Sequence, residues 1–239
     1  MVSHRILLTG GGTGGHIYPA LAVAEQLKED PDIEAILYIG ANGHLEEKLA
    51  VERGLKFVGL EVSGLPRKLS GALLTWPGQL TAAVFEARKT IREFRPTVVL
   101  GTGGYASAPP LIAACLMSIP YAIHEPDAHP GLVNRAFARC ARLVSCGMEG
   151  AVDRLKTARG RVVVNGNPVG NSFLNLLRRD SACAVFGLNP ELKTILITGG
   201  SQGAKALNDA VFHALASLLS LEPPVQIIHQ IGEKNIREY

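Results

Sequence analysis

Short aliphatic runs alternate along this chain with longer stretches in which apolar residues recur every three or four positions. The runs predict buried strands, and the spaced stretches predict helices that bury one face. Because strands and helices alternate, the sequence predicts an α/β fold with parallel sheets covered on both faces. The expected strands are Arg5–Thr9, Ala35–Ile39, Phe57–Glu61, Thr97–Leu100, Tyr121–Ile123, Leu143–Cys146, Arg161–Val164, Thr194–Ile197 and Val225–His229.

The first strand runs directly into a glycine-rich loop, in the stretch "ILLTGGGTGGHIYPALAVAEQL". Five glycines occupy the six positions from Gly10 to Gly15, and apolar residues then recur at helical spacing. Glycine permits positive φ and has no Cβ to keep a ligand away from the backbone. The free N–H groups and the positive dipole of the helix start are typical of an anion site, most naturally for phosphate.

Two familiar nucleotide-binding motifs compete for this loop. Gly10, Gly12 and Gly15 fit G-x-G-x-x-G, but the dinucleotide fingerprint also requires an acidic residue at the end of the second strand. The second strand here reads "AILYIGANG" and has no acid at its end, which argues against an NAD-dependent oxidoreductase. A Walker loop is excluded because no G-K-[ST] follows. A tight turn without any ligand stays as the plain alternative.

Two further glycine loops follow later strands, in "VVLGTGGYASAPPLIAA" and "TILITGGSQGAKALNDAV". The third loop repeats the pattern of the first, "ILITGG" against "ILLTGG", which predicts a second strand-loop-helix domain facing the first. The turn-like stretch "VNGNPVGN" is a suitable hinge. We therefore predict an N-terminal domain over residues 1–164 and the first part of a C-terminal domain over residues 165–239.

The second predicted domain is shorter than a typical domain of roughly 150 residues. The chain also ends shortly after a predicted strand. We expect a truncated protein or a fragment, with a compact protein of one and a half domains as the alternative.

Composition and charge exclude several classes of function. The 239 residues carry a net charge of only +3, which is too slight to indicate nucleic-acid binding. The N-terminus does not have the pattern of a signal peptide, and the longest apolar stretch is interrupted by Pro120 and too short to span a bilayer. The four cysteines show no metal-binding spacing, so we expect reduced core thiols.

The motifs together resemble the MurG-type family, glycosyltransferase family 28. The resemblance rests on "GGTGGHIYPALAVAEQL", "GTGGYASAPPLIAA", "HEPDAHPGLVNRAFA", "GNPV" and "TGGSQGAKALN", which follow the family's order over nearly the whole chain. It implies a GT-B fold, with two Rossmann-like domains and an active site in the cleft between them. It also implies transfer of N-acetylglucosamine from UDP-GlcNAc to undecaprenyl-linked muramyl-pentapeptide (lipid I). The transfer would be inverting and would use no metal or cofactor.

The resemblance also implies where the substrates bind. Thr13, Gly14 and Gly15 match positions at or beside the sugar-nucleotide donor, in a loop that also faces the acceptor diphosphate. In the third loop, Ser201 and Gln202 match donor-phosphate contacts, and Gly200 opens the loop beside them. Gly103, Gly104 and Tyr105 of the second loop are expected to border the acceptor site, although Tyr105 could equally be a packing residue.

His16 and Glu125 are the candidates for proton transfer. His16 lies at a helix start, where the dipole favours a neutral ring that can accept a proton from an acceptor hydroxyl. Its alternative role is to cap the helix or donate to a phosphate. Glu125 ends a strand and could bond a sugar hydroxyl or act as a base, or it could be buried as a pair with His124. Asn134 matches the same family stretch and is expected to order the loop.

Two positions depart from the family pattern. Where the family has His-Glu-Gln-Asn, this chain has "HEPD", which places Asp127 near the donor. Where the family has Asn-Pro-Val-Arg, this chain has Gly170 in place of the arginine. Because each change removes a favourable phosphate or sugar contact, each is expected to weaken UDP-GlcNAc binding.

The segment Ser63–Phe85 combines basic and apolar residues, among them Arg67, Lys68, Leu69, Leu73, Leu74, Trp76 and Leu80. This combination is typical of peripheral binding to an anionic bilayer, here the inner face of the cytoplasmic membrane. The alternative is a loop and helix packed on the sheet. Two other functions stay open: a related diacylglycerol glycosyltransferase, and a non-catalytic module that binds lipid diphosphate or nucleotide sugar.

Overall fold

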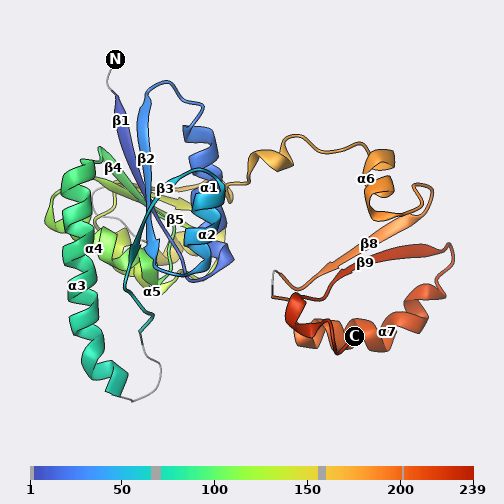
Figure 1. Ribbon diagram of the computed structural model, residues 1–239. Helices are drawn as coiled ribbons and strands as arrows, with labels where there is room; N and C mark the ends of the chain where they lie inside the picture. Colours follow the sequence, from blue (N-terminus) through green and yellow to red (C-terminus); the bar gives the residue numbers. More distant parts are fainter. Residues whose placement is uncertain (1–2, 66–70, 156–159, 201) are drawn as a thin grey trace. The chain divides into compact units, whose positions relative to one another are not determined.

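The computed structural model of the chain is shown in Figure 1 and describes residues 3–65, 71–155, 160–200 and 202–239. The chain divides into two compact units, Met1–Leu174 and Asn175–Tyr239. Each unit has its own parallel sheet. The alternation of strands and helices predicted from the sequence is therefore confirmed.

The sheet of the first unit has seven strands among the described residues, in the order β3-β2-β1-β4-β5-β6-β7. All neighbouring strands are parallel. Each strand predicted in this unit is present, with its ends shifted by at most two residues. The strands are β1 (His4–Thr9), β2 (Ile33–Ala41), β3 (Lys56–Leu60), β4 (Val98–Gly101), β5 (Tyr121–Glu125), β6 (Leu143–Cys146) and β7 (Arg161–Val164).

Helices cover both faces of this sheet and bury two separate apolar cores. One core packs α1 and α2 against the sheet, and the other packs α3, α4 and α5 against the opposite face. The apolar residues that recur at helical spacing in α1, such as Ile17, Leu21 and Ala24, are the ones that become buried. The helices are α1 (Gly14–Leu27), α2 (Leu45–Glu52), α3 (Gly71–Phe94), α4 (Ala108–Leu116) and α5 (Leu132–Ala138).

The strand order creates a switch point between β1 and β4. From β1 the chain moves to β2 and β3 on one side, and it then crosses over to β4 on the other side. The loops after β1 and β4 consequently leave the sheet in opposite directions, which is where open α/β sheets bind ligands. These two loops are the first and second glycine loops of the sequence.

The second unit contains α6 (Arg179–Phe186), β8 (Lys193–Thr198), α7 (Lys205–Leu219) and β9 (Val225–Gln230). β8 and β9 pair in parallel over six residues each. The third glycine loop connects β8 to α7, so it repeats the strand-loop-helix arrangement of the first loop. Asn208 of α7 is fully buried and donates to the carbonyl oxygen of Ile231 at 2.9 Å.

The boundary between the two compact units lies ten residues after the predicted one. The segment after Val164 belongs to the first unit because its polar groups bond to that unit. Asn165 donates its backbone N–H to the Cys146 carbonyl oxygen at 3.1 Å, and the Asn171 N–H donates to Glu25 Oε2 at 2.9 Å. The predicted hinge stretch is thus anchored, and the division falls after Leu174.

The cysteine prediction is half right. All four thiols are free, and Cys146 and Cys183 are buried. Cys115 and Cys140, however, are exposed, and they lie in the last turn of α4 and just after α5. Among the described residues, no helix is long and apolar enough to cross a membrane.

Candidate functional site

Three glycines of the first loop are required by close packing inside the protein. A Cβ atom at Gly10 would lie 2.0 Å from Thr102 Oγ1, and one at Gly11 would lie 2.2 Å from Glu46 Oε1. Gly12 has φ +86°, and its Cβ would lie 2.7 Å from the Tyr105 ring. These glycines let the first loop contact its neighbours, so a ligand is not needed to explain them.

The next residues of the loop are open to a ligand. Thr13 and Gly15 are exposed, and Gly14 is half-buried. Among the described residues, the backbone N–H groups of Gly14 and Gly15 have no hydrogen-bond partner. They lie at the start of the 14-residue helix α1, so bare donors and the positive end of the helix dipole coincide. This part of the loop has the chemistry of an anion site.

The second glycine loop packs directly onto the first. The Gly11 N–H donates to the Gly103 carbonyl oxygen at 3.2 Å. Gly103 and Gly104 have φ values of +100° and +78°, and a Cβ at Gly104 would lie 1.9 Å from the Gly11 carbonyl oxygen. Both residues must therefore be glycine for the two loops to meet.

His16 lies between the two loops and is half-buried. A Cβ at Gly103 would lie 2.7 Å from its Cδ2 atom, so the ring rests on the backbone of the second loop. Its Nδ1 atom is 3.1 Å from Thr13 Oγ1. Its carbonyl oxygen accepts a hydrogen bond from Thr102 Oγ1 at 2.6 Å. Thr102, which sequence reasoning missed, fixes the first turn of α1 to the end of β4.

Tyr105 and the buried Glu46 pack against the first loop, at Gly12 and Gly11 respectively. The Tyr105 ring covers Gly12 and lies 6.3 Å from the His44 ring, centroid to centroid. Burial, and secondarily the charge of Glu46, raise the pKa of Tyr105. Tyr105 thus packs on the first loop, and its place at the border of the acceptor site stays a prediction.

Sequence reasoning also missed Glu46. Its carboxylate is fully buried, and its Oε1 atom accepts the N–H of Ala41, the last residue of β2, at 3.2 Å. An acid therefore does reach the end of the second strand, but it comes from α2 and lies beneath Gly11. The Glu46 side chain itself fills the space beneath Gly11 and is closed to solvent. This supports the argument against a dinucleotide site. The only available signal was an acidic residue in the first turn of the helix after β2.

His124 and Glu125 end β5 on the ligand side of the sheet, as predicted. His124 Nδ1 lies 2.8 Å from Ser145 Oγ, and its Nε2 lies 3.0 Å from Asn167 Oδ1. Burial lowers the pKa of His124 below its ordinary value of 6.5, although the Asn167 bond and the Glu125 charge oppose this shift. His124 thereby ties β5 to β6 and to the segment after β7.

The Glu125 carboxylate is fully buried and organises the loop that follows it. Oε1 accepts the Asp127 N–H at 3.0 Å, and Oε2 accepts the Gly131 N–H at 3.1 Å. The Asn134 amide donates both to Glu125 Oε2 at 2.9 Å and to the His124 carbonyl oxygen at 3.0 Å. Glu125 and His124 are both buried, but each is held by other partners.

Asn134 connects this loop to the two glycine loops. A Cβ at Gly103 would lie 3.1 Å from Asn134 Nδ2 and 3.2 Å from His16 Nε2, so these groups converge on one point. The first loop, the second loop and the loop after β5 thus meet around His16. This convergence brings together the predicted residues Thr13, Gly14, Gly15, His16, Gly103, Gly104, Tyr105, Glu125 and Asn134.

The remaining predicted residues belong to the second unit. Gly200 has φ +78° and is exposed, as is Gln202, whereas Ser201 lies outside the described residues. Gly203 approaches the loop after β9 so closely that a Cβ would lie 1.9 Å from the Ile231 carbonyl oxygen. Gly200 and Gln202 therefore present an open loop at the carboxyl end of β8.

Comparison with known proteins defines the class. The family model of the glycosyltransferase family 28 N-terminal domain matches residues 6–145. The model of the glycosyltransferase family 28 C-terminal domain matches residues 194–239. The N-terminal match alone covers more than half of the chain. The chain belongs to glycosyltransferase family 28.

Two individual relatives are similar to nearly the whole of this chain. A protein of Halothermothrix orenii is 41% identical over 235 residues, and one of Bacteroides fragilis is 38% identical over 231 residues. Both are named UDP-N-acetylglucosamine–N-acetylmuramyl-(pentapeptide) pyrophosphoryl-undecaprenol N-acetylglucosamine transferase. The alignments cover 98% and 96% of this chain, but only 62% and 60% of the relatives. The chain thus spans less than two thirds of their length.

Solved structures agree with the fold. MurG of Acinetobacter baumannii matches with a TM-score of 0.68 at 28% identity, over 99% of this chain and 60% of that one. UDP-GlcNAc 2-epimerase of Neisseria meningitidis matches with a TM-score of 0.62 at 14% identity, over 97% of this chain and 67% of that one. The second match supports only the fold. The predicted GT-B class, with two parallel α/β units, is confirmed.

We expect Gly104→Ala to destabilise the first unit strongly. Positive φ costs a non-glycine residue about 1–3 kcal/mol, and the overlap with the Gly11 carbonyl oxygen adds a cost that is typically about 1–3 kcal/mol. Gly43→Ala is the matched control, because Gly43 has φ +70° but nothing within 4 Å of its Cβ position. Urea denaturation measures both variants. Equal losses in the free energy of unfolding would contradict the close contact between the loops.

We expect the stability of the first unit to fall as His124 is forced to take up a proton. Because its pKa is lower in the folded than in the unfolded chain, its contribution is complete above about pH 6.5 and is lost as the pH falls below that value. Urea midpoints from about pH 8 to about pH 5 should therefore decline less steeply in His124→Gln than in the wild type. His129→Gln, at an exposed histidine, should retain the wild-type slope. Identical slopes in all three proteins would contradict the assignment.

Proposed function

We propose that this chain forms the acceptor-binding unit and part of the donor-binding unit of an N-acetylglucosaminyltransferase. Its substrates would be UDP-GlcNAc and undecaprenyl-diphospho-muramyl-pentapeptide, the compounds that the relatives' names imply. In this proposal the first unit binds the acceptor and the second unit binds the sugar nucleotide. Family membership, the sequence identities and the open glycine loops support the proposal.

The observation that carries the proposal is the position of His16. Its ring lies at the switch point, beside the unpaired N–H groups of Gly14 and Gly15. Among the described residues, its Nε2 atom has no hydrogen-bond partner. A diphosphate bound at the start of α1 would therefore have a proton acceptor next to it, in a place fixed by both loops.

The proposed reaction needs no covalent intermediate. The acceptor hydroxyl oxygen attacks C1 of the donor sugar, and its proton passes to His16 Nε2. The bond from C1 to the diphosphate breaks, and its electron pair leaves with UDP. Backbone N–H groups at a helix start can stabilise the negative charge that develops on the leaving diphosphate. We propose Gly14 and Gly15 of the first loop for contacts to the acceptor diphosphate. We propose Gly200, Ser201 and Gln202 of the third loop for contacts to the donor diphosphate.

Glu125 has a supporting role in this proposal. Its carboxylate accepts three hydrogen bonds from Asp127, Gly131 and Asn134 and is closed to solvent. It would hold the loop after β5 in place, while Asn134 would position Gly103 beside His16. Proton transfer by Glu125 would first require these bonds to open.

Gly170 bears on donor binding. Its Cβ position lies 3.0 Å from Glu25 Oε2, a carboxylate that also pairs with Arg53 at 3.1 Å. An arginine at this position would begin beside a negative charge. This chain thus has the Glu25 carboxylate beside position 170, and no arginine side chain at that position.

His16→Gln tests the function. The side chain keeps a donor of similar reach but cannot take up a proton. The assay is GlcNAc transfer to a lipid-linked acceptor by a chimera in which this chain replaces the matching part of the Halothermothrix orenii relative. We expect turnover to fall at least about a hundredfold, with UDP-GlcNAc affinity by calorimetry nearly unchanged. His4→Gln, at the amino end of β1, is the control and should keep wild-type turnover.

The other outcomes decide against parts of the proposal. Near-normal turnover in His16→Gln would remove His16 from the chemistry. Loss of donor affinity instead would assign the ring to the diphosphate. An unmodified chimera that binds UDP-GlcNAc but transfers no sugar would favour the non-catalytic module.

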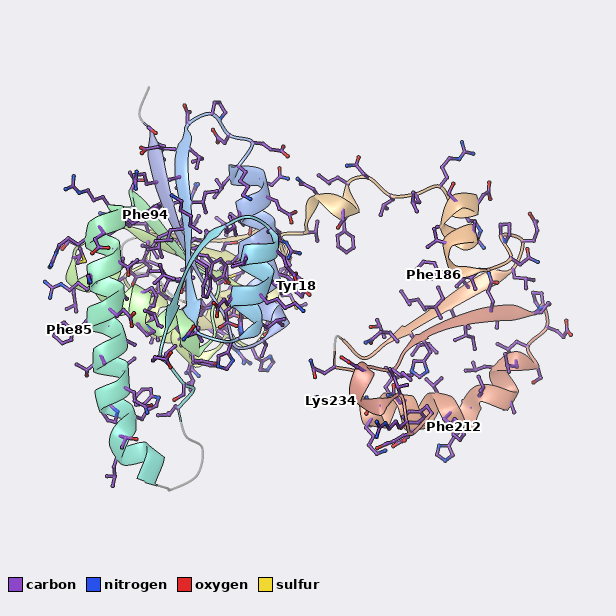
Figure 2. The ribbon with its side chains drawn as sticks, viewed as in Figure 1. Tyr18, Phe85, Phe94, Phe186, Phe212 and Lys234 are labelled. Atoms are coloured by element: carbon purple, nitrogen blue, oxygen red, sulfur yellow. The ribbon has the colours of Figure 1, made fainter. Side chains whose placement is uncertain are left out.

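We further propose peripheral membrane binding through the outer side of α3. Leu74 and Phe85 are 86% and 64% exposed, and Figure 2 shows Phe85 pointing away from the sheet. Phe85 also lines an apolar groove of about 320 Å³ between α3 and α4, together with Leu80, Val84, Arg88, Ile112 and Leu116. The predicted basic residues Arg67 and Lys68, and Leu69, lie outside the described residues, as does the side chain of Leu73. The anionic inner face of a bacterial membrane fits this chemistry.

Leu74→Asp/Phe85→Asp tests this surface. Burying each side chain in a bilayer contributes about 1.5–3 kcal/mol, so we expect co-sedimentation with phosphatidylglycerol vesicles to weaken at least about tenfold. Val51→Asp on α2, at another exposed apolar position, should sediment like the wild type. The proposal fails if the double variant binds as the wild type does, or if Val51→Asp weakens binding equally.

A further inference from the structure

Thr13 occupies the N-cap position of α1 but does not cap the helix. A threonine at this position normally accepts a hydrogen bond from a backbone N–H of the first turn. Thr13 has the expected extended backbone, with φ −145° and ψ 155°, yet its side chain makes no such bond. Its Oγ1 atom lies instead 3.1 Å from His16 Nδ1. The hydroxyl is therefore directed to the imidazole ring.

The ring of His16 has little freedom to turn away from this partner. Gly103 lies against Cδ2 and Nε2, and a Cβ at Gly104 would lie 3.2 Å from Nδ1. The Thr102 hydroxyl also fixes the backbone of His16 at its carbonyl oxygen. Nδ1 is thus held toward Thr13, and Nε2 is left as the nitrogen without a partner.

We propose that Thr13 is a positioning residue that fixes His16 as the Nδ1–H tautomer, an inference that rests on the proposed function of His16. Nδ1–H donates to Thr13 Oγ1, so the lone pair is on Nε2. When Nε2 takes the acceptor proton, the ring becomes a cation, and its Nδ1–H bond to Thr13 persists.

The opposite arrangement has different chemistry. If the Thr13 hydroxyl donates to Nδ1, the neutral ring carries its proton on Nε2. That ring can donate to a phosphate but cannot accept a proton at Nε2. The tautomer of His16 therefore distinguishes a base from a phosphate contact, and the direction of its hydrogen bond to Thr13 differs between the two.

His124 provides an internal reference for the measurement. The Asn167 amide donates its Nδ2 to the Pro126 carbonyl oxygen at 3.2 Å, which directs Asn167 Oδ1 toward His124 Nε2. His124 must therefore donate from Nε2, whereas its Nδ1 faces a Ser145 hydroxyl that donates to Asn165 Oδ1 at 2.7 Å. The two histidines are therefore expected to differ at Nε2, which carries a proton in His124 and none in the neutral ring of His16.

Long-range ¹H–¹⁵N correlation spectra of the histidine-labelled chain test the inference, at a pH above the titration of its histidines. We expect a protonated Nδ1 in His16 and a protonated Nε2 in His124. Thr13→Ser should retain the His16 signature, whereas Thr13→Val should turn it into a mixture of tautomers. Thr97→Val, at the amino edge of the sheet, is the control and should change neither histidine. An Nε2–H signature in wild-type His16, or an unchanged one in Thr13→Val, would overturn the inference.

Kinetics of the chimera give the second readout. Thr13→Val should lower kcat roughly tenfold, the value of one hydrogen bond, with little change in the KM for UDP-GlcNAc, and Thr13→Ser should restore kcat. A change in KM alone would overturn the positioning role and leave Thr13 as a substrate contact. The spectra need no turnover. A fixed Nδ1–H tautomer combined with an active His16→Gln variant would therefore contradict the proposed function and not the tautomer assignment.

Discussion

The backbone of Gly104 lies against the carbonyl oxygen of Gly11, and the geometry of the whole site depends on this contact. A Cβ atom at position 104 would lie only 1.9 Å from that oxygen, so no residue other than glycine fits there. Because the loops after β1 and β4 flank the switch point, their contact forms the floor of the site. His16 rests on this floor, and its ring is held by backbone on one side and Thr13 on the other.

Buried polar groups make this floor rigid. Glu125 uses both carboxylate oxygens to hold the loop after β5, and Glu46 lies under Gly11 at the end of β2. Three buried oxygens, Thr9 Oγ1, Glu46 Oε2 and Asn134 Oδ1, have no hydrogen-bond partner among the described residues. Such groups cost free energy and are uncommon in native proteins.

The residues after β7 extend this organisation beyond the sheet. Asn165 and Asn167 bond to Ser145 and His124, so the segment after β7 is fixed to the sheet near the site. In the proposed enzyme, the acceptor site and the segment after β7 are thus parts of one hydrogen-bonded structure.

The sequence by itself determined the α/β class, all nine strands that the structure describes and the three glycine loops, because apolar periodicity and glycine runs record local backbone preferences. The family motifs added the candidate residues. Only the tertiary structure decided which glycines serve packing, since Gly10, Gly11 and Gly12 are constrained by Thr102, Glu46 and Tyr105 from other elements. The structure also places the boundary between the two compact units after Leu174 and not after residue 164. Contacts between distant segments depend on strand order, and no local pattern in the chain encodes the partner of a buried carboxylate.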